Sequence, residues 1–188
     1  MRLVLATRNP HKAREFATLL APHDLVELPA TVQLPPETGD TFAANALEKA
    51  RAANRATGEA AVADDSGIEA AALAGAPGVR SARFAGEDAT DEENLAKLLR
   101  EAPAGSAVAY VCALAYVGAG GDELVVEGRC SGTLAARPRG DGGFGYDPAF
   151  LPDDVPDGRT MAELAPADKD AISHRGRAAR ALLARLGD

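Results

Sequence analysis

The order of helix and strand patterns is the feature that most constrains the fold of this chain. Strand and helix patterns alternate over the first third, and two longer strand patterns, 106–117 and 123–134, then follow as a hairpin. The other expected strands are 2–6, 25–28 and 60–63, and the first two expected helices are 9–20 and 40–56. This order predicts an α/β fold with a mixed sheet flanked by helices. At 188 residues, we expect one domain over 1–188, with two lobes.

Local signals mark where several helices begin and end. Asn9 is a good N-cap before Pro10, and Thr90 to Glu93 forms a capping box that opens a helix to about Arg100. Asp40 or Thr41 caps the second helix, Gly58 closes it, and Thr160 to Glu163 repeats the capping-box pattern. Ser173 is a candidate cap for a last helix to about Leu186. We expect loops over 68–86 and 136–147.

Composition excludes some classes of function. The formal net charge is −8, which disfavours non-specific nucleic-acid binding because such binding depends on lysine and arginine. No run approaches the roughly 20 apolar residues that span a bilayer, and the first residues do not resemble a signal peptide. Cys112 and Cys130 lie in expected strands without a metal-binding spacing, which indicates two buried thiols in a reducing compartment. We therefore expect a cytoplasmic protein with no nucleic-acid or membrane partner.

The run 62–67 ends an apolar strand in two aspartates, a serine and a glycine. Ligands of α/β proteins bind beyond the carboxyl ends of strands. Adjacent strand residues point to opposite faces, so Asp64 and Asp65 have different roles: one is a candidate ligand for Mg²⁺, and the other braces the turn. The alternative is a solvated Asp-Ser-Gly turn.

The first expected helix begins with a candidate anion site. Thr7 and Asn9 can donate hydrogen bonds, Lys12 adds a charge, and helix N-termini favour anions. The alternative is an ordinary capped helix with a solvated lysine.

The loop 140–148 combines glycines with two aromatic rings. Its spacing matches a dinucleotide fingerprint, but Tyr146-Asp147-Pro148 stands where a helix would have to begin, so we reject that interpretation. Phe144 or Tyr146 can stack on a base. The alternative is a glycine-rich turn whose aromatic rings belong to the core.

Lys169 and the run Ser173-His174-Arg175 form a third cationic stretch. An arginine in the first turn of a helix opposes the helix dipole unless an electron-rich ligand faces it, and its planar fork suits a phosphate or a base carbonyl. The alternative is a solvated arginine-rich helix.

Together these stretches indicate a nucleotide site with Mg²⁺, and their order resembles the inosine triphosphate pyrophosphatase family. That family removes abnormal purine nucleoside triphosphates. The matching segments run in order over nearly the whole chain: 7–12, 37–42, 45–46, 49–50, 63–67, 77–83, 142–148 and 171–175. Each segment is a weak signal, whereas the ordered set is highly specific.

The resemblance implies hydrolysis of ITP, dITP and XTP to the monophosphate and pyrophosphate, with Mg²⁺ as cofactor. It also implies a homodimer, an elongated mixed sheet, and two lobes with a central substrate cleft. By motif, Asp65 is the catalytic residue and a metal ligand, Glu37 is the second metal ligand, and Ser66 contacts substrate. The triphosphate would be bound by Thr7, Arg8, Asn9, Pro10, His11 and Lys12. Base and sugar would be recognised by Phe144, Gly145, Tyr146, Asp147, Lys169, His174 and Arg175.

One departure from the family pattern concerns the metal. Many relatives carry glutamate where this chain has Ala44, which cannot bind a cation. Asp40 or Asp64 therefore stays an alternative to Glu37 as the second ligand. Two alternatives also stay open for function: a pyrophosphatase for another modified nucleotide, such as a modified pyrimidine, and a non-catalytic nucleotide-binding module. The donors suit a carbonyl at C6 and would be unpaired against adenine, but the rejection of guanine has no visible signal.

Overall fold

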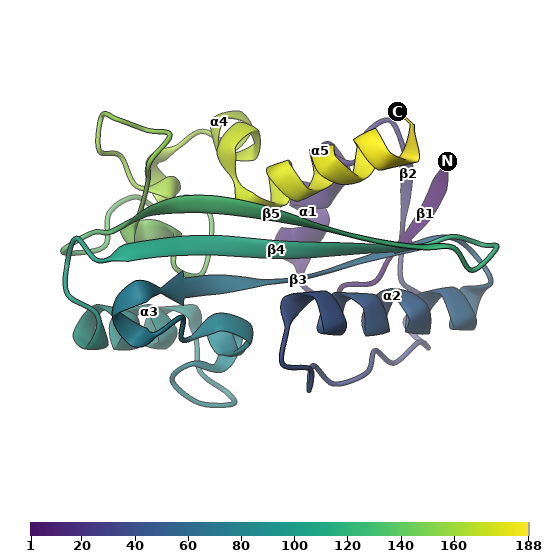
Figure 1. The fold of residues 1–188 in the computed structure, drawn as a ribbon, viewed down its shortest axis with the longest axis horizontal. Helices are drawn as coiled ribbons and strands as arrows, with labels where there is room; N and C mark the ends of the chain where they lie inside the picture. Colours follow the sequence, from purple (N-terminus) through teal and green to yellow (C-terminus); the bar gives the residue numbers. More distant parts are fainter. Residues whose placement is uncertain (188) are drawn as a thin grey trace. The chain divides into compact units, whose positions relative to one another are not determined.

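A six-stranded mixed sheet with flanking helices forms the protein, in a computed structural model that describes residues 1–187 (Figure 1). The strand order is β2-β1-β3-β4-β5-β6. Strand β1 is parallel to β2 and β3, whereas β6 is antiparallel to β5. The predicted α/β class is therefore confirmed.

The elements follow the expected order. The strands are β1 (Arg2–Leu5), β2 (Asp24–Glu27), β3 (Ala61–Ala70), β4 (Ala107–Val117), β5 (Glu123–Leu134) and β6 (Phe150–Pro152). The α-helices are α1 (Pro10–Leu19), α2 (Phe42–Thr57), α3 (Asp91–Glu101), α4 (Pro166–Ile172) and α5 (His174–Leu186). Short 3₁₀ helices are Ala71–Leu73, Gly78–Arg83, Asp147–Ala149 and Met161–Glu163. Asn9, Thr41 and Thr90 cap α1, α2 and α3 as predicted.

The chain divides into two compact units. The first comprises Met1–Asp65, Cys112–Gly128 and the described residues from 175 onward, and the second comprises Ser66–Val111 and Arg129–His174. Strands β3, β4 and β5 contribute residues to both units.

The core of the first unit lies between its strands and helices α1 and α5. Phe16 of α1 and Leu182 of α5 pack with Leu3, Val62 and Leu114 of the strands, and all five side chains are fully buried. Helix α2 covers the opposite face of these strands (Figure 1). The strands are therefore covered on both faces, which explains why β1 reads as a continuous apolar run.

The core of the second unit gathers residues from α3, β4, β5 and the segments that follow β5. Leu98, Leu134, Phe150 and Met161 are among its buried members. Cys130 belongs to this core and Cys112 to that of the first unit, and both thiols are buried, as expected. Within residues 1–187, the helices are all too short or too polar to cross a membrane.

Two predictions about local structure were wrong. Strand β3 does not end before Asp64 but continues to Ala70, so the run 64–67 is extended strand and not a turn, and the expected loop over 68–86 begins as strand. This strand lies beside β4 in the sheet, and near its end the Ser81 hydroxyl accepts from the amide of Ile68 at 2.9 Å. The sequence also gave no signal for α4 and β6. Ser173 follows α4 and directly precedes α5, which begins at His174, so it stands at the position predicted for the cap of the last helix.

Candidate active site

The turn between β1 and α1 has its hydrogen bonds satisfied locally. The Asn9 Oδ1 atom accepts from the amides of His11 and Lys12 at 2.9 and 3.2 Å, and the Thr7 hydroxyl accepts from the Asn9 amide at 3.2 Å. Pro10 occupies the first helical position, where no amide is needed. The first turn is thus fixed before any ligand binds, and Lys12 projects from a defined point.

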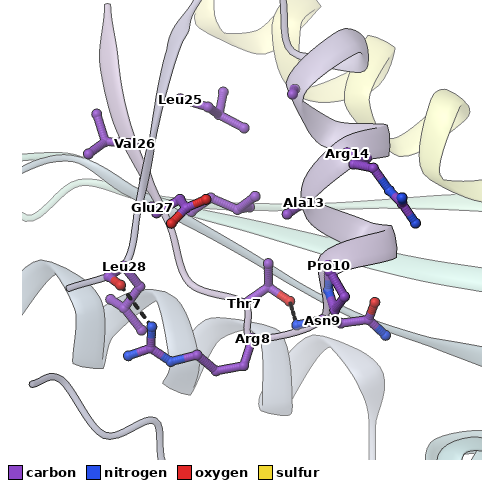
Figure 2. Close-up of a pocket in the computed structure, with 12 residues that line it drawn as sticks. Thr7, Arg8, Asn9, Pro10, Ala13, Arg14, Leu25, Val26, Glu27 and Leu28 are labelled. Atoms are coloured by element: carbon purple, nitrogen blue, oxygen red, sulfur yellow. Dashed lines mark hydrogen bonds between the residues drawn. The ribbon is translucent and has the colours of Figure 1, made fainter. Parts of the chain in front are cut away.

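Arg8 is turned toward the loop that follows β2. Its guanidinium donates to the carbonyls of Leu28, Pro29 and Val32 at 2.8, 2.7 and 2.8 Å. Figure 2 shows this arginine beside a pocket of about 520 Å³ that α1 shares with β2. The pocket is also lined by Thr7, Asn9 and Pro10. His11, at the same helix start, contacts Arg14 through its Nδ1 atom at 2.8 Å.

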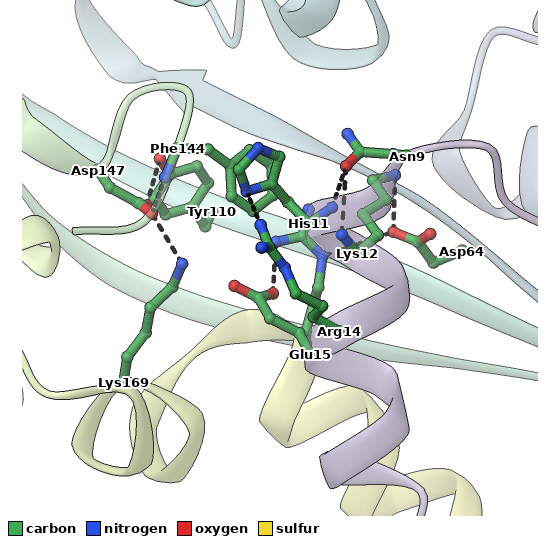
Figure 3. Close-up of polar contacts among 11 residues, drawn as sticks. Asn9, His11, Lys12, Arg14, Glu15, Asp64, Tyr110, Phe144, Asp147 and Lys169 are labelled. Carbon is green, nitrogen blue, oxygen red and sulfur yellow. Dashed lines mark hydrogen bonds and ion pairs between the residues drawn. The ribbon is translucent and has the colours of Figure 1, made fainter.

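Asp64 is the anion of a buried charge cluster in the first unit. Its Oδ2 atom lies 2.8 Å from Lys12 Nζ (Figure 3) and 3.7 Å from Arg175 Nε. Arg175 also donates to Glu15 Oε2 at 3.1 Å. Burial alone would raise the pKa of Asp64, but the charges of Lys12, Arg175 and Lys49 outweigh it and lower the pKa to about 2. Asp64 therefore stays ionised and holds two cations in place.

Asp65 faces different partners, as strand alternation predicts. Its Oδ2 atom accepts from Asn45 Nδ2 at 2.8 Å, and the Oδ1 atom of Asn45 accepts from the Gly39 amide at 2.8 Å. Burial raises the pKa of Asp65, and the negative charge of Glu37 raises it further. Glu37 forms an ion pair with Lys49 of α2. Burial would lower the pKa of Lys49, yet the surrounding carboxylates raise it overall.

The carboxylates of Asp65 and Glu37 fit a hard cation. Their oxygens are the donors that Mg²⁺ prefers, and the repulsion that raises the pKa of Asp65 is what a divalent ion would relieve. Over residues 1–187 no group of three or more His, Cys, Asp or Glu residues is placed to hold a metal. Magnesium commonly binds through one or two carboxylates together with substrate phosphates, so two carboxylates are sufficient.

Asp147 organises the polar cluster of the second unit. Its Oδ1 atom accepts from the Tyr110 hydroxyl at 3.0 Å, and its Oδ2 atom accepts from Lys169 Nζ at 2.7 Å and from the Phe144 amide at 3.0 Å (Figure 3). The side chains of Asp147, Lys169 and Tyr110 are all buried. One carboxylate thus fixes a strand, a helix and the glycine-rich loop relative to each other.

The aromatic residues of this cluster have different surroundings. The rings of Tyr110 and His174 are stacked, with centroids 4.6 Å apart and planes 9° apart. Lys169 Nζ lies 5.1 Å from the centroid of the half-buried Phe144 ring. Tyr146 is buried and donates its hydroxyl to the Ser81 carbonyl at 2.7 Å, so it belongs to the core. Phe144 is therefore the better candidate for stacking on a base.

Comparison with known proteins identifies the family. Residues 3–185 match the Ham1 family. The chain belongs to the Ham1 family. It is 50% identical over 195 residues to a dITP/XTP pyrophosphatase of Mycolicibacterium paratuberculosis, an alignment that covers 98% of this chain and 95% of that protein. It is also 50% identical to a dITP/XTP pyrophosphatase of Geobacillus kaustophilus, over 94% of this chain and 89% of the relative.

The fold agrees with solved structures of the Ham1 family. The structure of a HAM1 protein from Coxiella burnetii superposes with a TM-score of 0.87 at 40% identity, and it covers 100% of this chain and 98% of its own. The resemblance recognised in the sequence is thereby confirmed.

Within this Ham1 protein, the residues expected at the site fall into two sets. Lys12, Glu37 and Asp65 belong to the first unit, while Ser66 and most of the residues expected at the base belong to the second. Arg175 is the exception: it was expected at the base but lies in the first unit, 3.7 Å from Asp64. Ser66 lies in β3 directly after Asp65 and is half-buried. Gly145 has a positive φ of 62° and donates its amide to Asp91 at 2.8 Å, which ties the loop to the start of α3.

Several residues that make these contacts were not predicted from the sequence to have a role. Asn45 and Lys49 were matched to the family pattern, yet neither was assigned a role, and Tyr110, Glu15 and Asp91 were overlooked. A signal existed for the first two: they lie four residues apart in the otherwise apolar buried stripe of α2, formed by Phe42, Ala46, Ala50 and Ala53. Polar residues inside such a stripe need partners in the interior. Tyr110 had no signal, because it stands in a strand where tyrosine is common.

Proposed function

We propose that the protein hydrolyses dITP, XTP and ITP to the nucleoside monophosphate and pyrophosphate with Mg²⁺ as cofactor. Its family and its relatives at about 50% identity make it a nucleoside triphosphate pyrophosphatase, a hydrolase of phosphoric anhydride bonds. The substrates and the metal are the proposed part. The observation that carries the proposal is the different surroundings of two adjacent aspartates. Asp64 forms an ion pair with Lys12, whereas Asp65 lies near the carboxylate of Glu37.

The cations of the first unit suit a triphosphate. Lys12 and Arg175 are held at Asp64, and Lys49 is held at Glu37, so their positions are fixed before substrate binds. Phosphoryl transfer depends on positioning and charge neutralisation more than on covalent catalysis. These lysines would neutralise phosphate oxygens, with little reorganisation of the protein.

Asp65 suits the role of general base. The hydrogen bond from Asn45 fixes the orientation of its carboxylate, which a general base needs. In the proposed reaction, Asp65 accepts a proton from the water that attacks the phosphate chain. When bound at Asp65 and Glu37, Mg²⁺ would polarise phosphate oxygens and make the attacking water more acidic.

The cluster of the second unit suits a flat base with a carbonyl at C6. Phe144 offers a ring face with the Lys169 ammonium beside it, and His174, which stacks on Tyr110, offers ring nitrogens. The family resemblance adds Arg175 to the residues for the base. Adenine carries an amine in place of this carbonyl and would leave buried donors unpaired, which is an effective way to reject a substrate. The expected homodimer and the cytoplasmic location stay predictions.

The proposal is tested with a panel of nucleoside triphosphates and separate assays for pyrophosphate and orthophosphate. We expect pyrophosphate from XTP, ITP and dITP with Mg²⁺, little from ATP or GTP, and none when EDTA removes the metal. Orthophosphate as the first product would contradict the proposed reaction. Turnover of a modified pyrimidine in place of XTP would contradict the proposed base, and binding without turnover would indicate a nucleotide-binding module.

A further inference from the structure

We infer that Arg8 is a positioning residue that fastens the segment carrying Glu37 to the turn between β1 and α1. The family resemblance places Arg8 among the residues for the triphosphate, whereas in the structure its guanidinium bonds to the protein itself. The inference rests on the proposed function for its consequence, since Glu37 is a proposed ligand of Mg²⁺.

The segment 28–41 links β2 to α2, and within this fully described stretch there is no helix or strand. Its backbone groups therefore need partners other than a regular ladder of hydrogen bonds. Arg8 supplies three: its Nη1 atom donates to the Leu28 carbonyl at 2.8 Å. Its Nη2 atom donates to the carbonyls of Pro29 and Val32 at 2.7 and 2.8 Å. The Pro29 carbonyl also accepts from the Val32 amide at 3.0 Å, so Arg8 holds a closed turn.

The point from which Arg8 extends is itself fixed. Arg8 stands between Thr7 and Asn9, and the hydroxyl of Thr7 accepts from the Asn9 amide at 3.2 Å. The Asn9 side chain in turn caps α1. Figure 2 shows the arginine side chain reaching from this turn to Leu28. The start of α1 and the start of the segment 28–41 are thus bonded to each other.

The far end of the same segment is anchored to α2. The Gly39 amide donates to Asn45 Oδ1 at 2.8 Å, and Glu37 forms an ion pair with Lys49. Glu37 therefore lies between two anchors, with Arg8 at the first. Without Arg8, the Glu37 carboxylate would have more positions open to it before a cation binds. Ordering it on binding costs free energy, so the affinity for Mg²⁺ would fall.

The variant Arg8→Lys distinguishes a clamp from a phosphate ligand. Lysine keeps the positive charge, but its single nitrogen cannot occupy the positions of both Nη1 and Nη2, which bond to different carbonyls. A residue that binds phosphate by its charge would tolerate lysine. A clamp would lose most of its effect, so Arg8→Lys should behave like Arg8→Ala. Arg8 is exposed, and both variants should fold.

The first measurement is hydrogen–deuterium exchange over 28–41 in protein without metal or nucleotide, so it does not depend on activity. We expect exchange to be about threefold to tenfold faster in Arg8→Lys and Arg8→Ala. Arg51→Ala is the matched control, because the Arg51 guanidinium also makes three hydrogen bonds, to Glu48 and Glu123. That control should leave exchange over 28–41 unchanged. Unchanged exchange in both Arg8 variants would overturn the inference.

The second measurement is the Mg²⁺ concentration for half-maximal release of pyrophosphate from XTP. We expect it to rise about threefold to tenfold in both Arg8 variants, less than for loss of a group bonded directly to a metal ligand. Arg51→Ala should match wild type. If Arg8→Lys matches wild type while Arg8→Ala raises only the KM for XTP, Arg8 binds phosphate directly and the inference is wrong.

The two measurements also separate the inference from the proposed function. A wild-type protein that releases no pyrophosphate would refute the proposed function, whereas the exchange measurement would still test the clamp. An active wild type, with faster exchange in the Arg8 variants but an unchanged Mg²⁺ requirement, would refute the inference alone.

Discussion

Within residues 1–187, each unit contains a buried lysine–aspartate ion pair, and the two pairs have different surroundings. Lys12 and Asp64 are 2.8 Å apart in the first unit, and Lys169 and Asp147 are 2.7 Å apart in the second. The first pair lies among further charges that include Arg175, Lys49 and the carboxylate of Asp65. The second pair is surrounded by aromatic rings, a hydroxyl and a backbone amide.

The difference indicates which part of a nucleotide each cluster suits. Several cations of fixed position, with carboxylates for a metal, match the charge of a triphosphate. A single ion pair among rings matches a neutral base, where stacking and a few oriented donors decide the binding. In both clusters the aspartate holds the lysine in position.

The largest expected effect is the loss of turnover when Asp65, and not its neighbour Asp64, is the proposed base that is replaced. Asp65→Asn should lower kcat by about 10²–10⁴-fold, the range for loss of a general base. Asparagine keeps the shape and can still accept from Asn45, so the fold should persist. Steady-state release of pyrophosphate from XTP measures the effect, with the exposed Asp88→Asn as control. Wild-type turnover in Asp65→Asn would show that another residue is the base.

The next effect is on stability and belongs to Asp64. Asp64→Asn should reduce the free energy of unfolding by about 3 kcal/mol, because it leaves Lys12 and Arg175 without their buried anion. Asp65→Asn should change it by less than about 1 kcal/mol, since it removes a charge that Glu37 repels. Urea denaturation of both variants makes the comparison. Equal losses would mean that the two aspartates do not differ as their contacts suggest.

Acid should weaken the ion pairs that Asp64 forms with Lys12 and Arg175. The pKa of Asp64 is lowered to about 2 in the folded protein, against about 3.9 for an unperturbed aspartate. The stabilisation is therefore fully present above about pH 4 and is lost as the pH falls toward about 2. Denaturation of metal-free protein across this range should show the gap between wild type and Asp64→Asn closing as the pH falls. A constant gap would contradict the assigned ion pair.

Sequence patterns predicted the fold class well, because its signals are local. The cap at Asn9, the capping box at Thr90 and the apolar strand runs each depend on neighbouring residues, and all three were confirmed. The end of β3 was missed because the run 64–67 resembles a turn locally, whereas the strand continues beside β4, which is distant in sequence. Helix α4 has only seven residues and gives too short a pattern to recognise.

The sequence predicted which residues belong to the site better than it predicted which of them contact each other. Strand alternation shows that Asp64 and Asp65 differ, yet the partners, Lys12 for one and Asn45 for the other, come from separate helices. The pairing of Lys169 with Asp147 likewise joins residues 22 apart in sequence. Such contacts depend on tertiary packing, and only the ordered family motifs assigned these residues to nucleotide binding.

The smallest expected effect tests whether the second cluster recognises the base. His174→Phe keeps a ring to stack on Tyr110 but removes the ring nitrogens, so it should leave the packing in place and weaken the contact with a base carbonyl. We expect the preference for ITP over ATP, as a ratio of kcat/KM, to fall about tenfold, in the range of one hydrogen bond to a buried group. The dependence of turnover on Mg²⁺ concentration should stay as in wild type, because the carboxylates assigned to the metal lie in the first unit. An unchanged preference, or a shifted metal dependence, would show that the two clusters do not divide the nucleotide as their surroundings suggest.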